Sequence, residues 1–404
     1  MKSSMVEFTL PMVFVWLSLI CITSSDGRQA QVDRDGKLLS LFQIITFPND
    51  PCIGNAGKNG TCYTPEECTA KGGSAAGTCA QGYGVCCSFT VNCGGTRSEN
   101  CTYFESSGNE AGSCLATVCP CSDNICQLRL DFDQFVITGP STDDTPVLTT
   151  LAGDTAAGGQ ASTLGGRCLT DTFSVSSPSG CAPPSICGTN SGEHMYVDAS
   201  QACNDLMFVL GNQGIGASIA NRQWSIKVTQ YSCDFKNLAP EGCTQYFFGS
   251  STDIIQTYNF GNGRHLADQN QNICIRRERG NCKICYTAID PADVSVNGKT
   301  AKKGYNAKDT KCCGYTDSGK ATNGFDCIVI PGLRTTGADS VLKGDSVCGN
   351  GVGLVTGMTG IVGATVCSKR QPFNVRFRSD SFETDTEMGI LGFRLIYTQN
   401  SNGC

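Results

Sequence analysis

Histidine and charge are both scarce in this sequence. The 404 residues include only two histidines, His194 and His265, and 16% charged residues, with a formal net charge of −6. The two histidines lie far apart in sequence, so a histidine-based zinc site is not favoured. A weakly charged, acidic chain has no broad basic surface for a phosphate backbone. We therefore expect no nucleic-acid partner.

Long hydrophobic runs are also lacking. The main apolar run, Met12–Ile22, is preceded by Lys2 and followed by small polar residues. It is shorter than the roughly 20 residues of a membrane-spanning helix, and its layout is typical of a signal peptide. A buried N-terminal helix is the alternative. We predict a signal peptide at residues 1–25, an N-terminal linker at 26–51, and a secreted, extracellular protein without a membrane span.

No long segment has a helical period, whereas strand-like alternation recurs. In Gln127–Asp133, the residues Leu128, Leu130 and Phe132 fall on one face, and the charged residues fall on the other. This pattern predicts a half-buried strand. The same alternation is found in Trp224–Thr229, Phe373–Arg378 and Phe393–Leu395. We predict a mainly β protein with two antiparallel β-sandwiches, because about 300 residues of this pattern exceed one sandwich.

Cysteine is abundant. The sequence has 28 cysteines, and loss of Cys21 with the signal peptide leaves 27. In a secreted chain this density predicts disulfides. An odd number leaves one cysteine unpaired or intermolecular, so a disulfide-linked dimer is possible. Cys282–Cys285 and Cys119–Cys121 have spacings found in metal or redox sites, but among so many cysteines each is better interpreted as halves of separate bridges.

A compact cysteine-rich segment covers residues 52–87. Its cysteines are Cys52, Cys62, Cys68, Cys79, Cys86 and Cys87, with many glycines and few aliphatic residues between them. So short a segment needs covalent support to fold. The early Gly60–Cys62 and the closing Cys86–Cys87 resemble the clip domain of arthropod extracellular proteins. That resemblance implies the pairs Cys52–Cys86, Cys62–Cys79 and Cys68–Cys87, which spacing alone does not choose.

The two later segments resemble CUB domains. Residues 93–233 carry Cys168–Val175, Ile186–Gly188 and Trp224–Tyr231, and residues 243–404 carry Asp326–Gly332, Cys348–Gly349, Phe377–Asp380 and Gly392–Tyr397 in the same order. The split is expected at the linker 237–242, between Cys233 and Cys243. The whole chain resembles arthropod secreted proteins that join a clip-like module to two divergent CUB-like domains. We also expect Cys168, Cys187, Cys243, Cys274 and Cys348 to form disulfides.

Some CUB domains hold calcium among loop carboxylates. By this resemblance the candidate ligands are Asp171 in the first domain and Asp326 with Asp380 in the second. Calcium commonly takes about 6 to 8 oxygen ligands, and the first set looks incomplete. The alternative is that these aspartates cap turns and accept backbone hydrogen bonds. No other cofactor is indicated.

Two sequons and one basic run are candidates for glycan chemistry. Asn59-Gly60-Thr61 and Asn100-Cys101-Thr102 satisfy the acceptor pattern for N-glycosylation, which fits the secretory route. The run Arg276–Lys283 could hold a sulfated glycan, although such runs are more often solvated loops or strand edges.

Enzyme motifs are incomplete. Asp317–Gly319 and Gly344–Val347 hold fragments of the serine-protease motif without its glycine pair, and neither histidine lies in the sequence context of a protease base. We therefore expect a non-enzymatic recognition protein that binds an extracellular protein or glycan. A structural matrix protein and a non-catalytic regulator of an extracellular protease cascade are the alternatives.

Overall fold

The computed structural model describes thirteen stretches of the chain. They are residues 46–55, 57–107, 111–141, 165–178, 180–212, 221–290, 293–296, 326–335, 345–347, 349–350, 365–379, 391–402 and 404. The predicted signal peptide, Cys348 and the calcium candidate Asp380 lie outside these residues.

The N-terminal module is a small sheet crossed by one helix. Its elements are β1 (Pro51–Ile53), β2 (Asn59–Tyr63), α1 (Pro65–Ala70), β3 (Ser74–Cys79), the 3-10 turn η1 (Ala80–Gly82) and β4 (Gly84–Val91). Thr64 caps the start of helix α1, and the side chains of Thr64 and Glu67 each accept a hydrogen bond from the other's backbone N–H. Disulfides join Cys52 to Cys86, Cys62 to Cys79, and Cys68 to Cys87, the same pairs that the clip resemblance implies.

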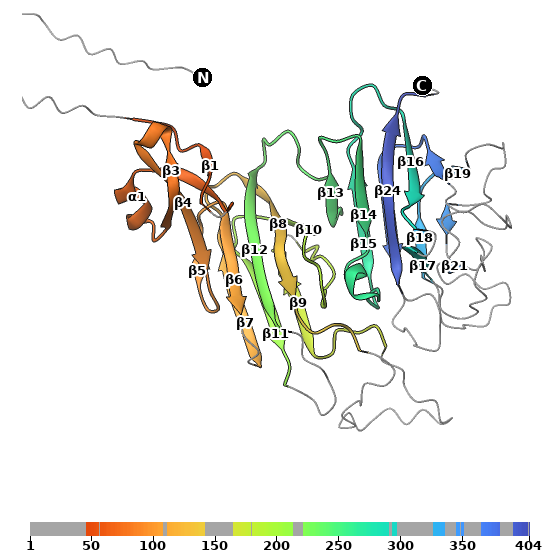
Figure 1. Cartoon of the computed structure of the whole chain (residues 1–404), viewed down its shortest axis with the longest axis horizontal. Helices are drawn as coiled ribbons and strands as arrows, with labels where there is room; N and C mark the ends of the chain where they lie inside the picture. Colours follow the sequence, from red (N-terminus) through yellow and green to blue (C-terminus); the bar gives the residue numbers. More distant parts are fainter. Residues whose placement is uncertain are drawn as a thin grey trace, which may run out of the picture. The chain divides into compact units, whose positions relative to one another are not determined.

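Strand β4 connects this module to the first sandwich. It pairs with β2 and β3 in the module and, in parallel, with β6, where Phe89 lies opposite Thr102. One sheet therefore runs through both parts in the order β1-β2-β4-β6-β12-β8-β10. Figure 1 shows β4, β6, β12 and β8 side by side.

Two sheets make up the first sandwich. The larger contains β6 (Thr102–Ser107), β8 (Ile125–Val136), β10 (His194–Asp198) and β12 (Gln223–Ser232), and the smaller has the order β5 (Thr96–Arg97), β7 (Gly112–Val118), β11 (Asn204–Leu210) and β9 (Asp171–Val175). Strand β8 buries Leu128, Leu130 and Phe132, as its alternation predicts. The core between the sheets includes six large aromatic residues, Phe104, Phe132, Phe135, Phe173, Phe208 and Trp224.

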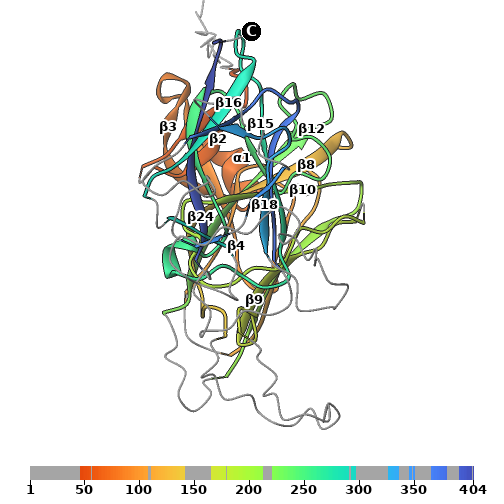
Figure 2. The same cartoon turned by 90° about the vertical axis from the view of Figure 1, so that its right-hand side faces the viewer.

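The second sandwich has shorter strands. One sheet has the order β13 (Gln245–Phe247), β15 (Asn270–Ile275), β23 (Phe373–Arg378), β18 (Cys327–Val329) and β20 (Ser346–Val347). The other has the order β19 (Arg334–Thr335), β22 (Val366–Ser368), β16 (Lys283–Ala288), β24 (Gly392–Asn400), β17 (Val294–Val296) and β21 (Gly349–Asn350), and β14 (Thr252–Gln256) also pairs with β24. A 3-10 turn, η2, covers Phe260–Asn262. The side view shows β24 and β18, one from each sheet (Figure 2).

These elements confirm the predicted fold class. The described residues contain a single α-helix of six residues, and nearly all other regular structure is β. No helix in that part of the chain is long and apolar enough to cross a membrane.

Seven more disulfides cross-link the sandwiches. They are Cys93–Cys114, Cys119–Cys203, Cys126–Cys233, Cys168–Cys187, Cys243–Cys274, Cys282–Cys404 and Cys285–Cys367. The two cysteines of Cys282–Cys285 therefore serve separate bridges, as predicted, whereas of Cys119–Cys121 only Cys119 is bridged. Cys327 is also disulfide-bonded. Three thiols are free among the described cysteines, at Cys101, Cys121 and Cys181, whereas the odd cysteine count by itself requires only one.

The two sandwiches share buried contacts within one compact unit, residues 47–404. Tyr258 from the second half of the chain packs in the core of the first sandwich. Next to it, the Asn259 backbone N–H donates to Asn190 Oδ1 at 2.7 Å, and Asn259 Oδ1 accepts the Thr189 backbone N–H at 2.9 Å. Gly188 has φ +80°, and a Cβ there would lie 1.9 Å from the Asn259 side chain. Only glycine fits at this crossing.

Phe208 tests the aromatic core. Its ring stacks on Trp224 at 4.0 Å and lies 4.6 Å from Phe173. We expect Phe208→Ala to lower the free energy of unfolding by about 3–5 kcal/mol, because it removes contacts and leaves a cavity. Met207→Ala, at the neighbouring exposed position, should cost less than about 1 kcal/mol. Denaturant unfolding with the disulfides intact measures both, and equal losses would contradict this account of the core.

Candidate functional site

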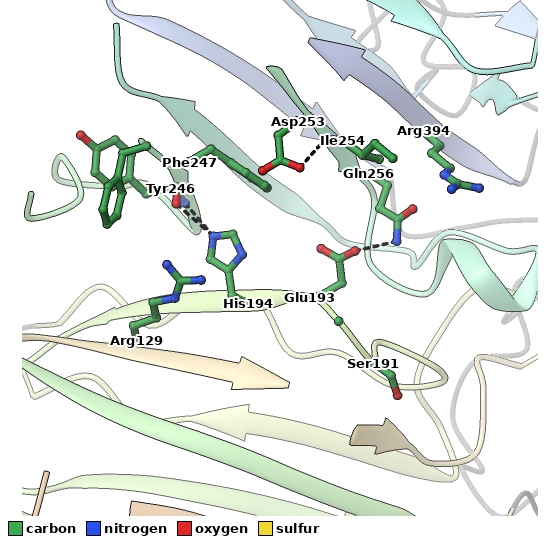
Figure 3. A pocket seen from close by; sticks show the side chains of 12 residues that line it. Arg129, Ser191, Glu193, His194, Tyr246, Phe247, Asp253, Ile254, Gln256 and Arg394 are labelled. Atoms are coloured by element: carbon green, nitrogen blue, oxygen red, sulfur yellow. Dashed lines mark hydrogen bonds between the residues drawn. The ribbon is translucent and has the colours of Figure 1, made fainter. Parts of the chain in front are cut away.

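A cleft of about 450 Å³ lies where the two sandwiches meet, and we call it the junction cleft. Residues of the first sandwich lie on one side and residues of the second on the other (Figure 3). The charged and polar lining residues are Arg129, Ser191, Glu193, His194, Asp253, Gln256 and Arg394, and the apolar ones are Tyr246, Phe247, Phe248 and Ile254.

Glu193 is positioned by the turn that starts β10. Gly192, with φ +87°, donates its N–H to Phe132 O, and Phe132 donates to Glu193 O at 2.9 Å. The turn thereby directs the Glu193 carboxylate across the junction, where it accepts hydrogen bonds from Gln245 Nε2 at 2.7 Å and Gln256 Nε2 at 2.6 Å. A carboxylate of one sandwich is therefore held by two amides of the other.

Burial sets the protonation of Glu193. It raises the pKa of this carboxyl to about 6, with a smaller rise from Asp253, while the two glutamine hydrogen bonds oppose it. The carboxylate is thus charged at neutral pH and becomes protonated under mildly acidic conditions. It is the group of the junction cleft whose charge changes closest to neutrality.

His194 is neutral and committed to the backbone. Burial, followed by the charge of Arg129, lowers its pKa to about 3. Its Nε2 atom accepts the Tyr246 N–H at 3.1 Å, which adds a further hydrogen bond between the sandwiches. Ser191 is bonded to the Phe135 backbone instead of to this imidazole. The pair does not have the nucleophile-to-base contact of a serine hydrolase.

The outer part of the cleft carries charges of both signs. Arg129 pairs with Asp131 at 2.7 Å and lies 5.7 Å above the Tyr196 ring. Asp253 is exposed and accepts the N–H of Ile254, which is itself 39% exposed. Arg394 projects from β24, which pairs with the strand of Asp253 and Ile254 (Figure 3). This mixture of charges, amides and aromatic carbon suits the binding of a polar ligand more than proton transfer.

The structure places the calcium candidate Asp171 beside a buried arginine. Arg222 donates from Nε to Oδ2 at 2.8 Å and from Nη2 to Oδ1 at 2.7 Å. Thr138 N–H and Gly211 N–H also bind the carboxylate, at 2.8 and 3.1 Å. Burial opposes ionisation, but the hydrogen bonds from Arg222 and Thr138 hold the pKa of Asp171 below its ordinary value. The cation at this carboxylate is therefore the Arg222 guanidinium.

The second candidate, Asp326, is buried against His265. Its Oδ2 lies 3.1 Å from His265 Nε2, and the imidazole packs edge-on against Phe377. Asp171 and Asp326 lie in different sandwiches. Within the described ranges, no three histidine, cysteine, aspartate or glutamate side chains gather closely enough to hold a metal ion. The donor groups around Asp171 do not fit a calcium ion, and the structure supplies no described calcium site.

The two sequons differ in their surroundings. Asn59 lies in β2, and its backbone N–H binds Tyr103 Oη at 2.7 Å. At Asn100 the side chain itself is engaged, because Nδ2 donates to Gln230 O and Oδ1 accepts the Gln230 N–H. Glycosylation of either asparagine remains a prediction.

The basic run Arg276–Lys283 forms the loop between β15 and β16. Arg276 is engaged with Glu278 and lies 5.2 Å from the Phe248 ring, whereas Arg277 and Arg279 are exposed. None of the loop residues lines the junction cleft, although Arg276 contacts the lining residue Phe248.

The sequence did not single out most of this cleft. The lining residues Glu193, Gln256 and Arg394 are far apart along the chain, and none belongs to a recognisable motif. Gly192 does indicate locally that a turn precedes the strand that starts with His194. Nothing local indicated which amides would face the carboxylate.

A disulfide-linked sandwich of two antiparallel sheets is a common class of extracellular module. Residues 240–400 match the animal CUB domain model, so the C-terminal part of this chain is a CUB domain. No curated protein matches the chain.

Among solved structures, the chain is similar to the CUB1-EGF-CUB2 domains of rat MASP-1, with 12% identity over 76% of this chain and 99% of that one, at a TM-score of 0.24. The same region of human MASP-1/3 has 12% identity over 74% and 98%, at 0.21. The extracellular region of zebrafish Gpr126/Adgrg6 has 9% identity over 78% and 34%, at 0.24. Scores this low add nothing to the family match.

Arg222 provides a test of the buried ion pair. We expect Arg222→Met to lower the free energy of unfolding by about 3–5 kcal/mol at neutral pH, because Asp171 would be left buried and charged without its counter-ion. The loss should shrink as the pH falls, since protonation relieves the isolated carboxylate but weakens the wild-type pair. Arg279→Met, at an exposed arginine, is the control. A loss that does not change with pH would count against this role.

Glu193 and His194 have opposite linkage to pH. The raised pKa of Glu193 stabilises the fold at acidic pH, an effect that is lost as the pH rises through about 6. The lowered pKa of His194 stabilises the fold above its unfolded value of 6.5, an effect that is lost on acidification.

We therefore expect Glu193→Gln to lose stability more steeply than wild type between about pH 6.5 and 4.5, by roughly 1–2 kcal/mol. Denaturant unfolding across that range measures the slope, with the exposed Glu241→Gln as control. A slope that matches wild type would show that Glu193 does not titrate as its burial implies.

Proposed function

We propose that this chain is a secreted, non-enzymatic recognition protein that binds an extracellular protein or glycan. The observation that carries the proposal is the CUB domain at residues 240–400, a family of extracellular modules that mediate protein interactions and are typically not catalytic. The signal-peptide pattern at residues 1–25 and ten described disulfides support export to an oxidising compartment.

The proposal includes the other modules. Residues 93–233 act as a second, divergent CUB-like domain, and residues 52–87 act as a clip-like module that engages a separate partner, as in the arthropod secreted proteins that the sequence resembles. The pairing of Cys52 with Cys86, Cys62 with Cys79 and Cys68 with Cys87 supports the clip-like assignment.

We place recognition at the junction cleft. Asp253, Ile254 and Arg394 present a carboxylate, an exposed apolar side chain and a guanidinium along one rim, so the site can pair with charges of either sign. Glu193 and His194 lie deeper and are already bonded across the junction. They hold the two walls in place instead of contacting the ligand.

The test is affinity capture from extracellular fluid with the intact secreted protein, in parallel with its Asp253→Lys variant. We expect a specific protein or glycan partner to be recovered with the wild type and reduced at least about tenfold by the charge reversal, a change of about 1.4 kcal/mol. Glu241→Lys, which reverses an exposed charge outside the cleft lining, should capture as much as wild type.

Other outcomes separate the alternatives. A protein that resists extraction and cross-links without a specific partner would support a matrix role. A change in protease activation rates in a reconstituted cascade, with no capture that depends on Asp253, would support a regulatory role. Hydrolase activity in the purified chain without any captured partner would overturn the recognition proposal.

A further inference from the structure

Two of the three described free thiols lie at the same end of the first sandwich. Cys101 directly precedes β6, and Cys121 follows β7 in the connection to β8. Between their backbones lies Gln230 of β12, a polar side chain that is only 4% exposed. Both cysteine segments are anchored to this one residue.

The Gln230 side chain fixes the segment of Cys121. Its Oε1 atom accepts the Cys121 N–H at 2.8 Å, and its Nε2 atom donates to Cys119 O at 3.1 Å and to Ser98 O at 3.2 Å. A single buried amide therefore bonds the chain both before Cys101 and around Cys121.

The Gln230 backbone fixes the segment of Cys101. Asn100 Oδ1 accepts the N–H groups of Gln230 and Cys101, each at 2.8 Å, and Asn100 Nδ2 donates to Gln230 O. Cys101 itself has φ +59°, a left-handed conformation that is uncommon for a residue with a Cβ atom. The position of this cysteine is therefore set by specific contacts.

Cys121 also acts electrostatically on Cys101. Burial raises the pKa of Cys101, and the nearby Cys121 adds to this rise. Burial likewise raises the pKa of Cys121. The hydrogen bonds of Gln230 bring the segments of the two cysteines together.

We propose that Cys101 and Cys121 are joined by a disulfide in the secreted protein. The bridge closes a loop of 20 residues, similar to the separations of 17 to 21 residues at Cys62–Cys79 and Cys93–Cys114. It links the residue before β6 to the connection that follows β7, and Gln230 already forms hydrogen bonds with both of these segments. Of the three described thiols, it leaves only Cys181.

The oxidation is balanced by a disulfide oxidant of the secretory compartment, such as a small-molecule disulfide. One thiolate attacks the oxidant to give a mixed disulfide and releases one thiol. The second thiolate then displaces the other thiol and forms the Cys101–Cys121 bond. Two protons and two electrons leave the protein, and the oxidant is reduced to two thiols.

The test is disulfide mapping of the intact secreted protein. Free thiols are alkylated in denaturant, N-glycans are removed, and the chain is cut after glutamate and aspartate without reduction. Cleavage after Glu99 and Glu105 isolates residues 100–105, with Cys101 as their only cysteine, from residues 111–123, which contain Cys121. We expect the short peptide to be released only on reduction, and alkylation at Cys181.

Cysteine variants identify the partner. Cys101→Ser should make Cys121 newly alkylated, and Cys121→Ser should release peptide 100–105 with an alkylated Cys101. The matched control Cys181→Ser should leave the linked peptides unchanged. Recovery of alkylated peptide 100–105 from unreduced wild type, or its linkage to any cysteine other than Cys121, would overturn the proposal. Fragmentation of the linked wild-type peptides, which distinguishes Cys121 from Cys114 and Cys119, gives this answer even if a variant fails to fold.

Discussion

Covalent cross-linking is the constraint on which this structure depends. Many strands of the second sandwich have only two or three residues, too few for the backbone ladder to hold them alone. Cys285–Cys367 joins β16 to the three-residue β22, and Cys282–Cys404 ties the last residue to the start of β16. Because each bridge limits the freedom of the unfolded chain, short strands can form a stable sheet.

Within that covalent frame, the sandwiches differ in how they fill their cores. The first relies on close aromatic packing, with Phe208 between Phe173 and Trp224. The second places its aromatic residues among aliphatic ones, and its Phe377 and Phe393 rings lie 6.0 Å apart; the aromatic residues are Tyr286, Phe373, Phe377, Phe393 and Tyr397. Asp171 and Arg222 show that a charged pair can also be buried, because each charge and most of the carboxylate hydrogen bonds are satisfied inside the protein.

Contacts from both sandwiches form the junction between them. Glu193 and His194 of the first sandwich form hydrogen bonds with Gln245, Gln256 and Tyr246 of the second. In turn, Tyr258 from the second half of the chain is buried in the core of the first sandwich. Two modules joined only by a linker would leave this surface open to water. Here the contacts form the walls of the junction cleft, so a ligand at its rim would meet residues from a preformed surface.

The sequence alone determined the class of fold and much of its covalent character. The alternation at Leu128, Leu130 and Phe132 requires a half-buried strand, because successive side chains of a strand point to opposite faces. The density of cysteines indicated disulfides for a similarly local reason. In contrast, the resemblance that suggested calcium at Asp171 gave no indication of Arg222. This arginine lies 51 residues further along the chain and binds the Asp171 carboxylate.

Only the tertiary structure decided which distant groups meet. Glu193 reaches amides 52 and 63 residues further along the chain, and Gln230 contacts segments more than a hundred residues before it. Such contacts depend on the order in which strands pair within a sheet and on how the sandwiches pack. The alternation of apolar residues along a strand shows which of its faces is buried. It does not show which other strand or amide covers that face.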